Sequence, residues 1–358
     1  MLDKLTLRDF RCFDSAHVEL HAETTIFTGR NGQGKTSLIE AACVLLRLQS
    51  PRTSSREELV RFGAPAAVVE GRWNNVMLRC AQSAKARRLA LDGVVCTRSA
   101  DYLSASGVVV WMDHGDMNML RAGAEHRRRF LDFTGSQLYP DYLNALRAYD
   151  RALRGRNYAL KKDAVIAWRQ ADAFARVMSE HARVLRDRRA ALIELLSPEV
   201  SVNHLALSGA GEAAAIEYLC GYSGVDLFDE LLLRRSDEER TRSTACGTHR
   251  DDVGLSLNGR DAGSFASEGQ QRTLALAMKL AQAQVLHQMR GQPPLLLIDD
   301  VFGELDRHRR RALMAGMPKG TQKVITTTHL DWLEESEFSG WVYEVDQGGV
   351  GRVKDRSR

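Results

Sequence analysis

Apolar positions change their spacing several times along this chain of 358 residues. Short apolar and β-branched runs predict strands near the start, at 5–7, 18–20 and 24–28. From Lys35 to about residue 46 the apolar residues recur at helical spacing, which predicts a buried helix. Residues 66–98 alternate weakly and contain Asp92-Gly93, a hairpin signal, so an antiparallel meander is expected there.

The second half of the pattern begins with helices and ends with strands. A short apolar run at 108–111 is followed by an Arg- and Ala-rich stretch, about 125–197, that predicts helices ending before Pro198. The later elements expected are a strand–helix passage over 200–240, a strand at 253–257, a long helix at 270–289, and strands at 295–298 and 324–328. The charged tail after Gly348 is expected to fray. No run of about 18 apolar residues occurs, and charges interrupt the first residues, so neither a membrane span nor an export signal is expected.

The residues after the third predicted strand fit the phosphate-loop pattern G-x-x-x-x-G-K-[ST] at every fixed position. The segment consists of Gly29, Arg30, Asn31, Gly32, Gln33, Gly34, Lys35 and Thr36. Glycines let backbone N–H groups close around phosphate oxygens, and the helix N-terminus adds its positive dipole end. We expect Lys35 to reach the β- and γ-phosphates of ATP and Thr36 to coordinate Mg²⁺.

Two carboxylates follow the apolar run at 295–298. Such a run is typical of a central parallel strand, whose carboxyl end would present Asp299 and Asp300. Asp299 is expected to hold Mg²⁺, and Asp300 to polarise the water that attacks the γ-phosphate. Because Asp is one methylene shorter than Glu, the water would be held less firmly, and hydrolysis should be slow.

A third motif, Ser267-Glu268-Gly269-Gln270, directly precedes the long amphipathic helix. Ser267 is expected near the helix start, Gly269 permits close approach, and the free N–H groups make an anion site. Alone, this segment could be nothing more than a helix cap. The order along the chain is the stronger signal, because phosphate loop, Ser-x-Gly-Gln, carboxylate strand and a histidine after a later strand, His329, follow one another.

This order resembles that of the ABC-type ATPase heads, and further segments make the resemblance closer. They are Leu5, Leu7, Phe10 and Arg11, then Ser37–Glu40, Pro51–Ser54, Arg127–Asp132, His249–Asp252, Leu257–Asp261, Ser267–Leu276 and Asp299–Asp306. With these segments in this order, the chain resembles the RecF family of bacterial DNA-repair proteins along nearly its whole length.

The resemblance implies an α/β fold, a P-loop NTPase of the ABC/SMC-head type with an inserted, mostly helical lobe. Lobe I would comprise 1–110 and 293–358, and lobe II 111–292, with a basic helical arm at about 125–240 and the signature motif at 266–272. The resemblance further implies an ATP-dependent homodimer, in which Ser267 of one subunit closes on the nucleotide held by the other. Gly303–Asp306 would be the D-loop and His329 the γ-phosphate sensor, while either Asp113 or Asp116 could be the Q-loop residue.

The family also implies a biological role: a cytoplasmic, ATP-dependent DNA-binding protein that acts at single-strand gaps. Together with RecO and RecR, it would promote RecA loading, replication restart and the SOS response. Two rival functions share some of the motifs. One is the ATPase subunit of a membrane transporter, although transporters nearly always carry Glu at the position of Asp300. The other is a DNA clamp that binds ATP without hydrolysing it.

The charge distribution bears on the DNA partner. The net charge is only +4, yet residues 121–189 contain 16 Lys and Arg against 8 Asp and Glu, a local balance of +8. Such cations can neutralise DNA phosphates, although a solvated helix face would show the same pattern. The DNA contacts expected are Arg127, Arg128, Arg129, Arg154, Arg156, Lys161 and Lys162. The six scattered cysteines are expected to be buried free thiols in a reducing compartment.

Overall fold

The computed structural model describes residues 1–209, 211–335 and 339–353, and the chain divides into two compact units. Unit 1 comprises Met1–His114 and Gln282–Arg358, and unit 2 comprises Gly115–Ala281. The second boundary falls inside helix α10 (Glu268–Arg290), so the two units share this helix. The sequence had placed the helix wholly in lobe II.

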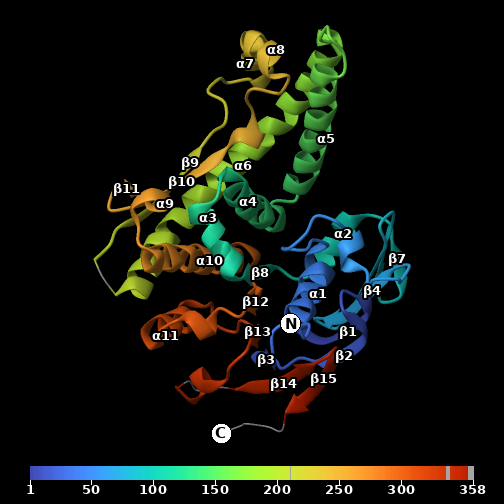
Figure 1. Cartoon of the computed structure of the whole chain (residues 1–358), viewed down its shortest axis with the longest axis vertical. Coiled ribbons are helices and arrows are strands. Elements are labelled where there is room, and N and C mark those ends of the chain that lie inside the picture. Colours follow the sequence, from blue (N-terminus) through green and yellow to red (C-terminus); the bar gives the residue numbers. More distant parts are fainter. Residues whose placement is uncertain (210, 336–338, 354–358) are drawn as a thin grey trace. The chain divides into compact units, whose positions relative to one another are not determined.

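Unit 1 is built on a mostly parallel sheet with the strand order β15-β14-β3-β13-β12-β8 (Figure 1). These strands are β3 (Thr24–Thr28), β8 (Val109–Met112), β12 (Leu295–Asp299), β13 (Lys323–Thr327), β14 (Gly340–Asp346) and β15 (Gly349–Val353). All are parallel to their neighbours except β15, which is antiparallel to β14. Because parallel strands end at one edge, the segments that follow β3, β8, β12 and β13 meet there.

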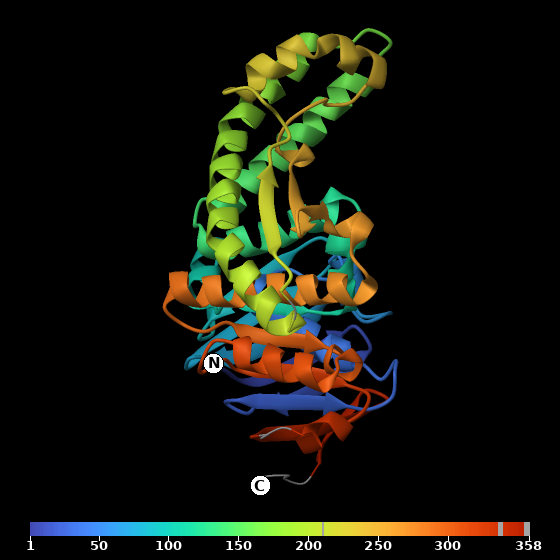
Figure 2. The same cartoon turned by 90° about the vertical axis from the view of Figure 1, so that its left-hand side faces the viewer.

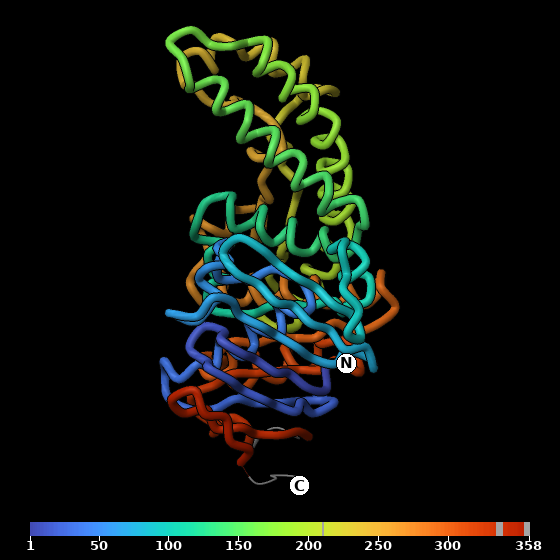
Figure 3. The backbone as a smooth tube through the Cα atoms, turned by 90° about the vertical axis from the view of Figure 1, so that its right-hand side faces the viewer, coloured from blue at the N-terminus to red at the C-terminus, as the bar shows by residue number. Residues whose placement is uncertain are grey.

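An antiparallel sheet completes unit 1, and the blue and cyan strands of Figure 3 run side by side in the order β2-β1-β4-β5-β6-β7. Its strands are β1 (Leu2–Phe10), β2 (Phe13–Glu19), β4 (Ala67–Trp73), β5 (Val76–Gln82), β6 (Arg87–Leu91) and β7 (Val94–Cys96). Helix α1 (Lys35–Arg47) contacts strands of both sheets, and nearly all of its residues are buried. A helix enclosed in this way needs apolar side chains all round, as its sequence has. The other helices of unit 1 are α2 (Ser99–Ala105) and α11 (Arg307–Gly316).

The expectation that the chain frays after Gly348 is wrong for residues 349–353, which form β15. Val342 and Val345 of β14 are buried against the sheet, so the end of the chain is tied to unit 1. The connecting residues Gln347 and Gly348 have φ angles of 46° and 79°, as a two-residue hairpin turn requires. Residues 354–358 lie outside the described residues.

Unit 2 contains an antiparallel sheet and several helices. The strand order is β11-β10-β9, with β9 at Ala214–Leu219, β10 at Asp252–Leu257 and β11 at Arg260–Asp261. The helices are α3 (Asn118–Arg121), α4 (Ala124–Leu138), α5 (Tyr142–Lys161), α6 (Trp168–Ser208), α7 (Leu227–Leu233), α8 (Arg235–Thr241) and α9 (Ala262–Phe265). Figure 2 shows α5 and α6 lying side by side as the arm of this unit. Small residues such as Ala152, Ala175 and Ala182 are buried between them and allow close packing.

Helix α6 corrects the predicted helix end at residue 197. It continues through Pro198 to Ser208 and ends at Gly209, which has a left-handed φ of 64°. Proline removes one backbone donor and usually breaks a helix. Here Leu196 and Val200 on either side of it are fully buried, so packing offsets the lost hydrogen bond. The strand predicted soon after residue 200 therefore begins only at Ala214.

None of the described helices is long and apolar enough to cross a lipid bilayer. The six cysteines, which all lie in described segments, are free thiols. Only Cys43, Cys80 and Cys246 are buried, whereas Cys12 and Cys220 are exposed and Cys96 is partly so. The expectation of six buried thiols is therefore wrong for half of them.

Candidate nucleotide site

The phosphate loop connects β3 to α1 and depends on its glycines. Gly29, Gly32 and Gly34 have φ angles of 140°, 80° and 105°, a region that other residues rarely adopt. A Cβ atom on Gly29 would lie 2.3 Å from the Val345 carbonyl oxygen, and one on Gly34 would lie 2.8 Å from Cys12 Sγ. Neither conformation nor space permits a side chain at these two positions.

Lys35 lies against the loop that it is expected to serve. Its Nζ donates to the Gly29 carbonyl at 2.6 Å and to the Arg30 carbonyl at 2.8 Å. Burial lowers the pKa of Lys35, and the nearby negative charges of Asp300 and Asp299 oppose that shift. The ammonium group therefore stands between the phosphate loop and the two carboxylates.

Asp299, at the end of β12, accepts two short hydrogen bonds. Its Oδ1 accepts from the Thr36 hydroxyl at 2.8 Å and from the Thr326 hydroxyl at 2.6 Å. Burial raises the pKa of Asp299, the two hydroxyl donors lower it, and the charge of Asp113 raises it further. A hydroxyl and a carboxylate joined across 263 positions of sequence thus converge on one point.

These oxygens fit Mg²⁺. Magnesium prefers hard oxygen ligands and usually takes only one or two from the protein, with waters and phosphates completing the shell. In the part of the chain that the structure describes, no group of three or more His, Cys, Asp or Glu side chains forms a ready-made metal cage. Thr36 and Asp299 are therefore the kind of sparse donor pair that a nucleotide-bound magnesium ion requires.

Asp300 has a left-handed backbone, with φ at 55°. Its N–H group donates to both the carbonyl and the hydroxyl oxygen of Thr326, each at 3.1 Å. Aspartate tolerates this conformation better than most residues, because its short polar side chain can bond locally.

The structure distinguishes the two Q-loop candidates. Met112 pairs with Ile298 in the register of β8 and β12, so Asp113 and Asp299 follow at the same edge. Asp113 also raises the pKa of Asp299 through its charge. Asp116, in contrast, belongs to unit 2, where its Oδ1 lies 2.7 Å from Lys279 Nζ. The geometry favours Asp113.

His329 lies two residues beyond β13, and its side chain is exposed. Strand β13 lies between β3 and β12 in the sheet. The Thr327 hydroxyl donates to its carbonyl at 2.8 Å, which fixes the backbone after the strand. The imidazole is thus presented at the same sheet edge as the phosphate loop and the carboxylates. The D-loop segment follows Asp300 as a short 3₁₀ turn, Phe302–Glu304, and Asp306 caps α11 through the Arg309 N–H at 2.8 Å.

A buried cluster below the phosphate loop was not predicted to act at the site. Glu40 of α1 is fully buried and accepts from Arg11 Nη2 at 2.6 Å, Ser50 Oγ at 2.6 Å and Arg52 Nη1 at 3.3 Å. The charge of Arg52 in turn lowers the pKa of Asp299. Arg11, Glu40 and Arg52 lie within the segments of resemblance, but nothing in their spacing linked them.

The signature motif forms a reciprocal cap in unit 2. The Ser267 N–H donates to Gln270 Oε1 at 2.8 Å, and the Gln270 N–H donates to Ser267 Oγ at 3.3 Å. Gly269, in the first turn of α10, accepts from the Thr273 hydroxyl at 2.8 Å. The predicted cap is confirmed, and Ser267 belongs to a different unit from the phosphate loop.

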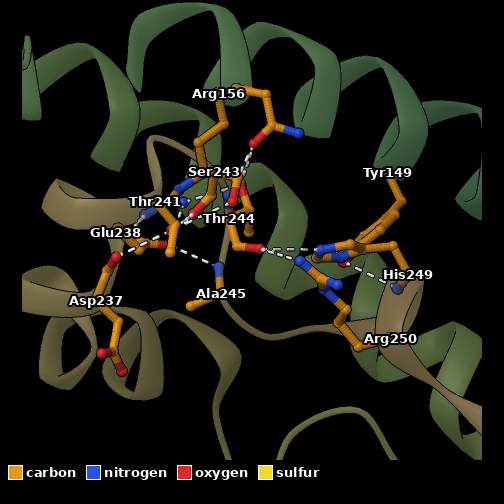
Figure 4. Close-up of polar contacts among 11 residues, drawn as sticks. Tyr149, Arg156, Asp237, Glu238, Thr241, Ser243, Thr244, Ala245, His249 and Arg250 are labelled. Carbon is orange, nitrogen blue, oxygen red and sulfur yellow. Dashed lines mark hydrogen bonds and ion pairs between the residues drawn. The ribbon is translucent and has the colours of Figure 1, made fainter. Parts of the chain in front are cut away.

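Part of the predicted DNA-contact set is used inside unit 2. Arg156 is 1% exposed and binds Glu238 through two contacts of 2.7 Å, as Figure 4 shows beside Thr244. Arg127 forms a two-pronged pair with Asp252 at 2.6 and 2.9 Å, and Arg128 donates to the Asp251 carbonyl at 2.8 Å. These three arginines hold the fold together.

The other predicted contacts lie at the surface. Arg129 is exposed and pairs with Glu125 one helical turn away. Arg154 and Lys161 of α5 are also exposed, as is Lys162 directly after this helix. Of the predicted set, Arg156 is therefore excluded by burial, and the exposed members lie on α4, on α5 and directly after α5.

The chain is similar in sequence to a known protein family. Residues 1–349 match the family model described as the RecF/RecN/SMC N terminal domain. The chain is 36% identical over 362 residues to the DNA replication and repair protein RecF of Synechococcus sp. (strain JA-2-3B'a(2-13)), covering 95% of this chain and 93% of the relative. This chain belongs to the RecF family.

Solved structures agree with the membership. The recombination mediator protein RecF-ATPrS in the RecFOR pathway matches with a TM-score of 0.87 and 25% identity, covering 99% of this chain and 98% of that chain. A second structure, RecF-ATP in the same pathway, matches with a TM-score of 0.85 and 26% identity, covering 98% and 97%. The predicted ABC/SMC-head fold with an inserted helical lobe is confirmed.

Proposed function

We propose that this RecF-family chain binds Mg·ATP at its phosphate loop and hydrolyses it slowly. ATP binding and hydrolysis would control whether the protein binds DNA. One observation carries the proposal. Lys35, Thr36, Asp299 and Asp300 come from segments more than 260 positions apart, as the 263-position Thr36–Asp299 bond shows, and they meet at one sheet edge. Chance would rarely bring this set together in this order after two parallel strands.

Each residue has a role that follows from its place. The phosphate loop would bind the phosphates through its N–H groups, and Lys35 would neutralise their charge. Thr36 and Asp299 would hold Mg²⁺, which would supply positive charge against the phosphates. Asp300 would orient the attacking water and accept its proton. His329, exposed at the same edge, would contact the γ-phosphate.

The signature motif supports a homodimer. A phosphate bound by the loop in unit 1 needs donors on its other side to exclude water, and the N-terminus of α10 with Ser267 provides them. We place Ser267 of one subunit against the nucleotide of the other, as the ABC-head resemblance implies. The two subunits would then separate at this interface when the γ-phosphate leaves.

Helix α5 offers the DNA surface. Four exposed cations and one exposed tyrosine recur along it at offsets of 4, 7, 11 and 14 from the first: Arg147, Arg151, Arg154, Tyr158 and Lys161. At 3.6 residues per turn these positions form one stripe. A stripe of cations suits phosphate backbones of any sequence. We propose that it contacts DNA at single-strand gaps and that the protein works there with RecO and RecR to promote RecA loading, replication restart and SOS induction.

The decisive experiment is hydrolysis by the Asp300→Asn variant. Asparagine keeps the left-handed backbone but loses the proton acceptor, so the single-turnover rate should fall about 10²–10⁴-fold, the usual worth of a general base. Binding of ATP, measured by fluorescence with a labelled nucleotide, should stay within a few-fold of wild type.

Matched variants separate the alternatives. Asp101→Asn changes a half-exposed carboxylate of α2 that pairs with Arg98, and this variant should hydrolyse ATP like wild type. Lys35→Met should lose both binding and turnover. A clamp that only binds ATP would show the same negligible turnover in wild type and Asp300→Asn, and that result would refute the proposed hydrolysis. A salt-independent affinity for gapped DNA would refute the α5 stripe.

A further inference from the structure

One carboxylate of unit 2 touches both the signature motif and the long arm helix. Glu212, in the connection between α6 and β9, accepts from Gln270 Nε2 through Oε1 at 2.7 Å. Its other oxygen, Oε2, lies 3.1 Å from His204 Nε2 on α6. The Glu212 side chain is 19% exposed, and His204 is fully buried. A single side chain therefore links α10 to α6.

The contact with His204 fixes the orientation of the carboxylate. In the described part of the chain, His204 Nδ1 has no hydrogen-bond partner, so Nε2 makes the polar contact of this buried ring with Glu212. A buried polar ring that lost this contact would have no compensation for its burial. Glu212 is therefore held firmly from the α6 side.

The backbone next to Glu212 is held as well. The Ala213 N–H donates to Asn258 Oδ1 at 2.9 Å, and the Asn258 N–H donates to the Ala213 carbonyl at 2.8 Å. Asn258 belongs to the tight turn between β10 and β11, with φ at 51°. The segment that presents Glu212 is thus attached to a sheet on one side and to a helix on the other.

Gln270 uses both ends of its amide. Its Oε1 accepts from the Ser267 N–H, and its Nε2 donates to Glu212. An amide held at both ends cannot rotate without breaking a hydrogen bond. Glu212 is therefore linked to Ser267 through the Gln270 amide.

We propose that Glu212 is a positioning residue for the signature motif, seated on α6 by His204. It would hold Ser267 and the start of α10 in the geometry that meets the partner subunit's nucleotide. The inference rests on the proposed role of Ser267 in hydrolysis. It adds residues that no motif contains and a physical connection from the arm helix to that motif.

Removing the carboxylate tests the proposal. With Glu212→Ala, kcat for ATP should fall about tenfold, in line with the loss of one charge-assisted hydrogen bond. The affinity of the isolated subunit for ATP should stay unchanged, because the phosphate loop lies in unit 1. A residue that merely stabilised the fold would lower the melting temperature and leave kcat of the folded fraction as it was; that outcome would overturn the proposal.

An exchange of the two groups gives a sharper test. Gln270→Glu alone places two carboxylates against each other and should lower kcat at least as far as Glu212→Ala. Adding Glu212→Gln restores an amide–carboxylate pair in the reverse order, and kcat should recover to within about threefold of wild type. Failure of the double variant to recover would mean that Gln270 acts on the nucleotide by another route, and the proposal would be wrong.

Two controls distinguish a failure of the positioning role from a failure of the proposed function. Glu217→Gln makes the same exchange at an exposed position on β9 and should leave kcat unchanged. If wild-type protein neither hydrolyses ATP nor dimerises with it, the proposed function fails and the positioning role fails with it. If wild type does both and Glu212→Ala matches it, only the positioning role fails.

Discussion

The candidate nucleotide site of unit 1 and the interior of unit 2 use charged residues in opposite ways. At that site Lys35, Asp299 and Asp300 gather at one sheet edge, where Lys35 Nζ donates to backbone carbonyls and Asp299 Oδ1 accepts from hydroxyl groups. In unit 2, the most buried cations are matched with acids, as in the pair of Arg156 and Glu238. The first arrangement leaves charged groups that a ligand can contact, whereas in the second the charges are neutralised by ion pairs inside the fold.

Arg189 of α6 is a second buried cation that is fully paired within the fold. It is almost fully buried, and its guanidinium lies 2.7 Å from Asp132 and 2.6 Å from Asp251. Burial raises the pKa of Asp251, while Arg189 and the Tyr218 hydroxyl oppose the shift. Positive charge counted along the sequence therefore overstates the charge available to DNA. The exposed face of a helix on which a cation lies is a better indication of whether it can contact DNA.

The sharpest way to test this contrast is Arg156→Met. The substitution would leave Glu238 buried without its cation, which should cost about 3–5 kcal/mol of unfolding free energy. Arg154→Met, two residues earlier and exposed, should cost less than about 0.5 kcal/mol. Urea unfolding of both variants gives the comparison. Equal losses would mean that the buried pair is no more than a surface contact.

A second test uses pH. Burial lowers the pKa of His249 to about 4, and Tyr149 Oη lies 2.7 Å from its Nδ1 (Figure 4). The unfolded histidine takes up a proton below about pH 6.5, whereas the folded one stays neutral, so stability should fall as the pH drops from about 6.5 to 4. The loss from this group is at most about 3 kcal/mol.

The control for this test is His249→Gln, which cannot titrate in that range. Urea unfolding at pH 7.5 and pH 5 should give a smaller pH difference for the variant than for wild type. The same pH difference in both proteins would show that His249 is not held neutral by the fold.

The smallest expected effect concerns the α5 stripe. Arg151→Ala should leave the fold intact and reduce the slope of log affinity against log salt by about 1, the value for one phosphate contact. Anisotropy titrations with gapped duplex DNA measure that slope. Arg240→Ala on α8, also exposed, is the matched control and should not change it. A slope that responds equally to both would move the DNA surface away from α5.

The arrangement of the candidate nucleotide site was largely predictable because its motifs have fixed local spacings. The phosphate loop, the strand before Asp299 and the helix after Ser267 are each determined by neighbours within a few positions. The parallel sheet then brings them together by topology alone. Asp113 could not be chosen over Asp116 from the sequence, because the choice depends on the register of β8 with β12.

The features that were not predictable depend on distant partners. Arg156 looked available until its acid, 82 positions away, was known. Likewise, 58 positions separate Glu212 from Gln270. Helix α6 passes Pro198 because buried neighbours compensate for the lost bond, and β15 forms because β14 is already anchored beside β3. The local sequence alone favours a helix end at Pro198 and a frayed chain after Gly348.

The left-handed backbone at Asp300 narrows the choice of side chain there. Aspartate and asparagine adopt such a φ far more readily than residues with longer or branched side chains. Lengthening the carboxylate to glutamate, which would bring it nearer to a water molecule, would also place a less tolerant residue in the turn that Thr326 fixes. Under the proposed function, the rate of hydrolysis and the backbone conformation are therefore coupled at Asp300, and faster hydrolysis would require a different bend after β12.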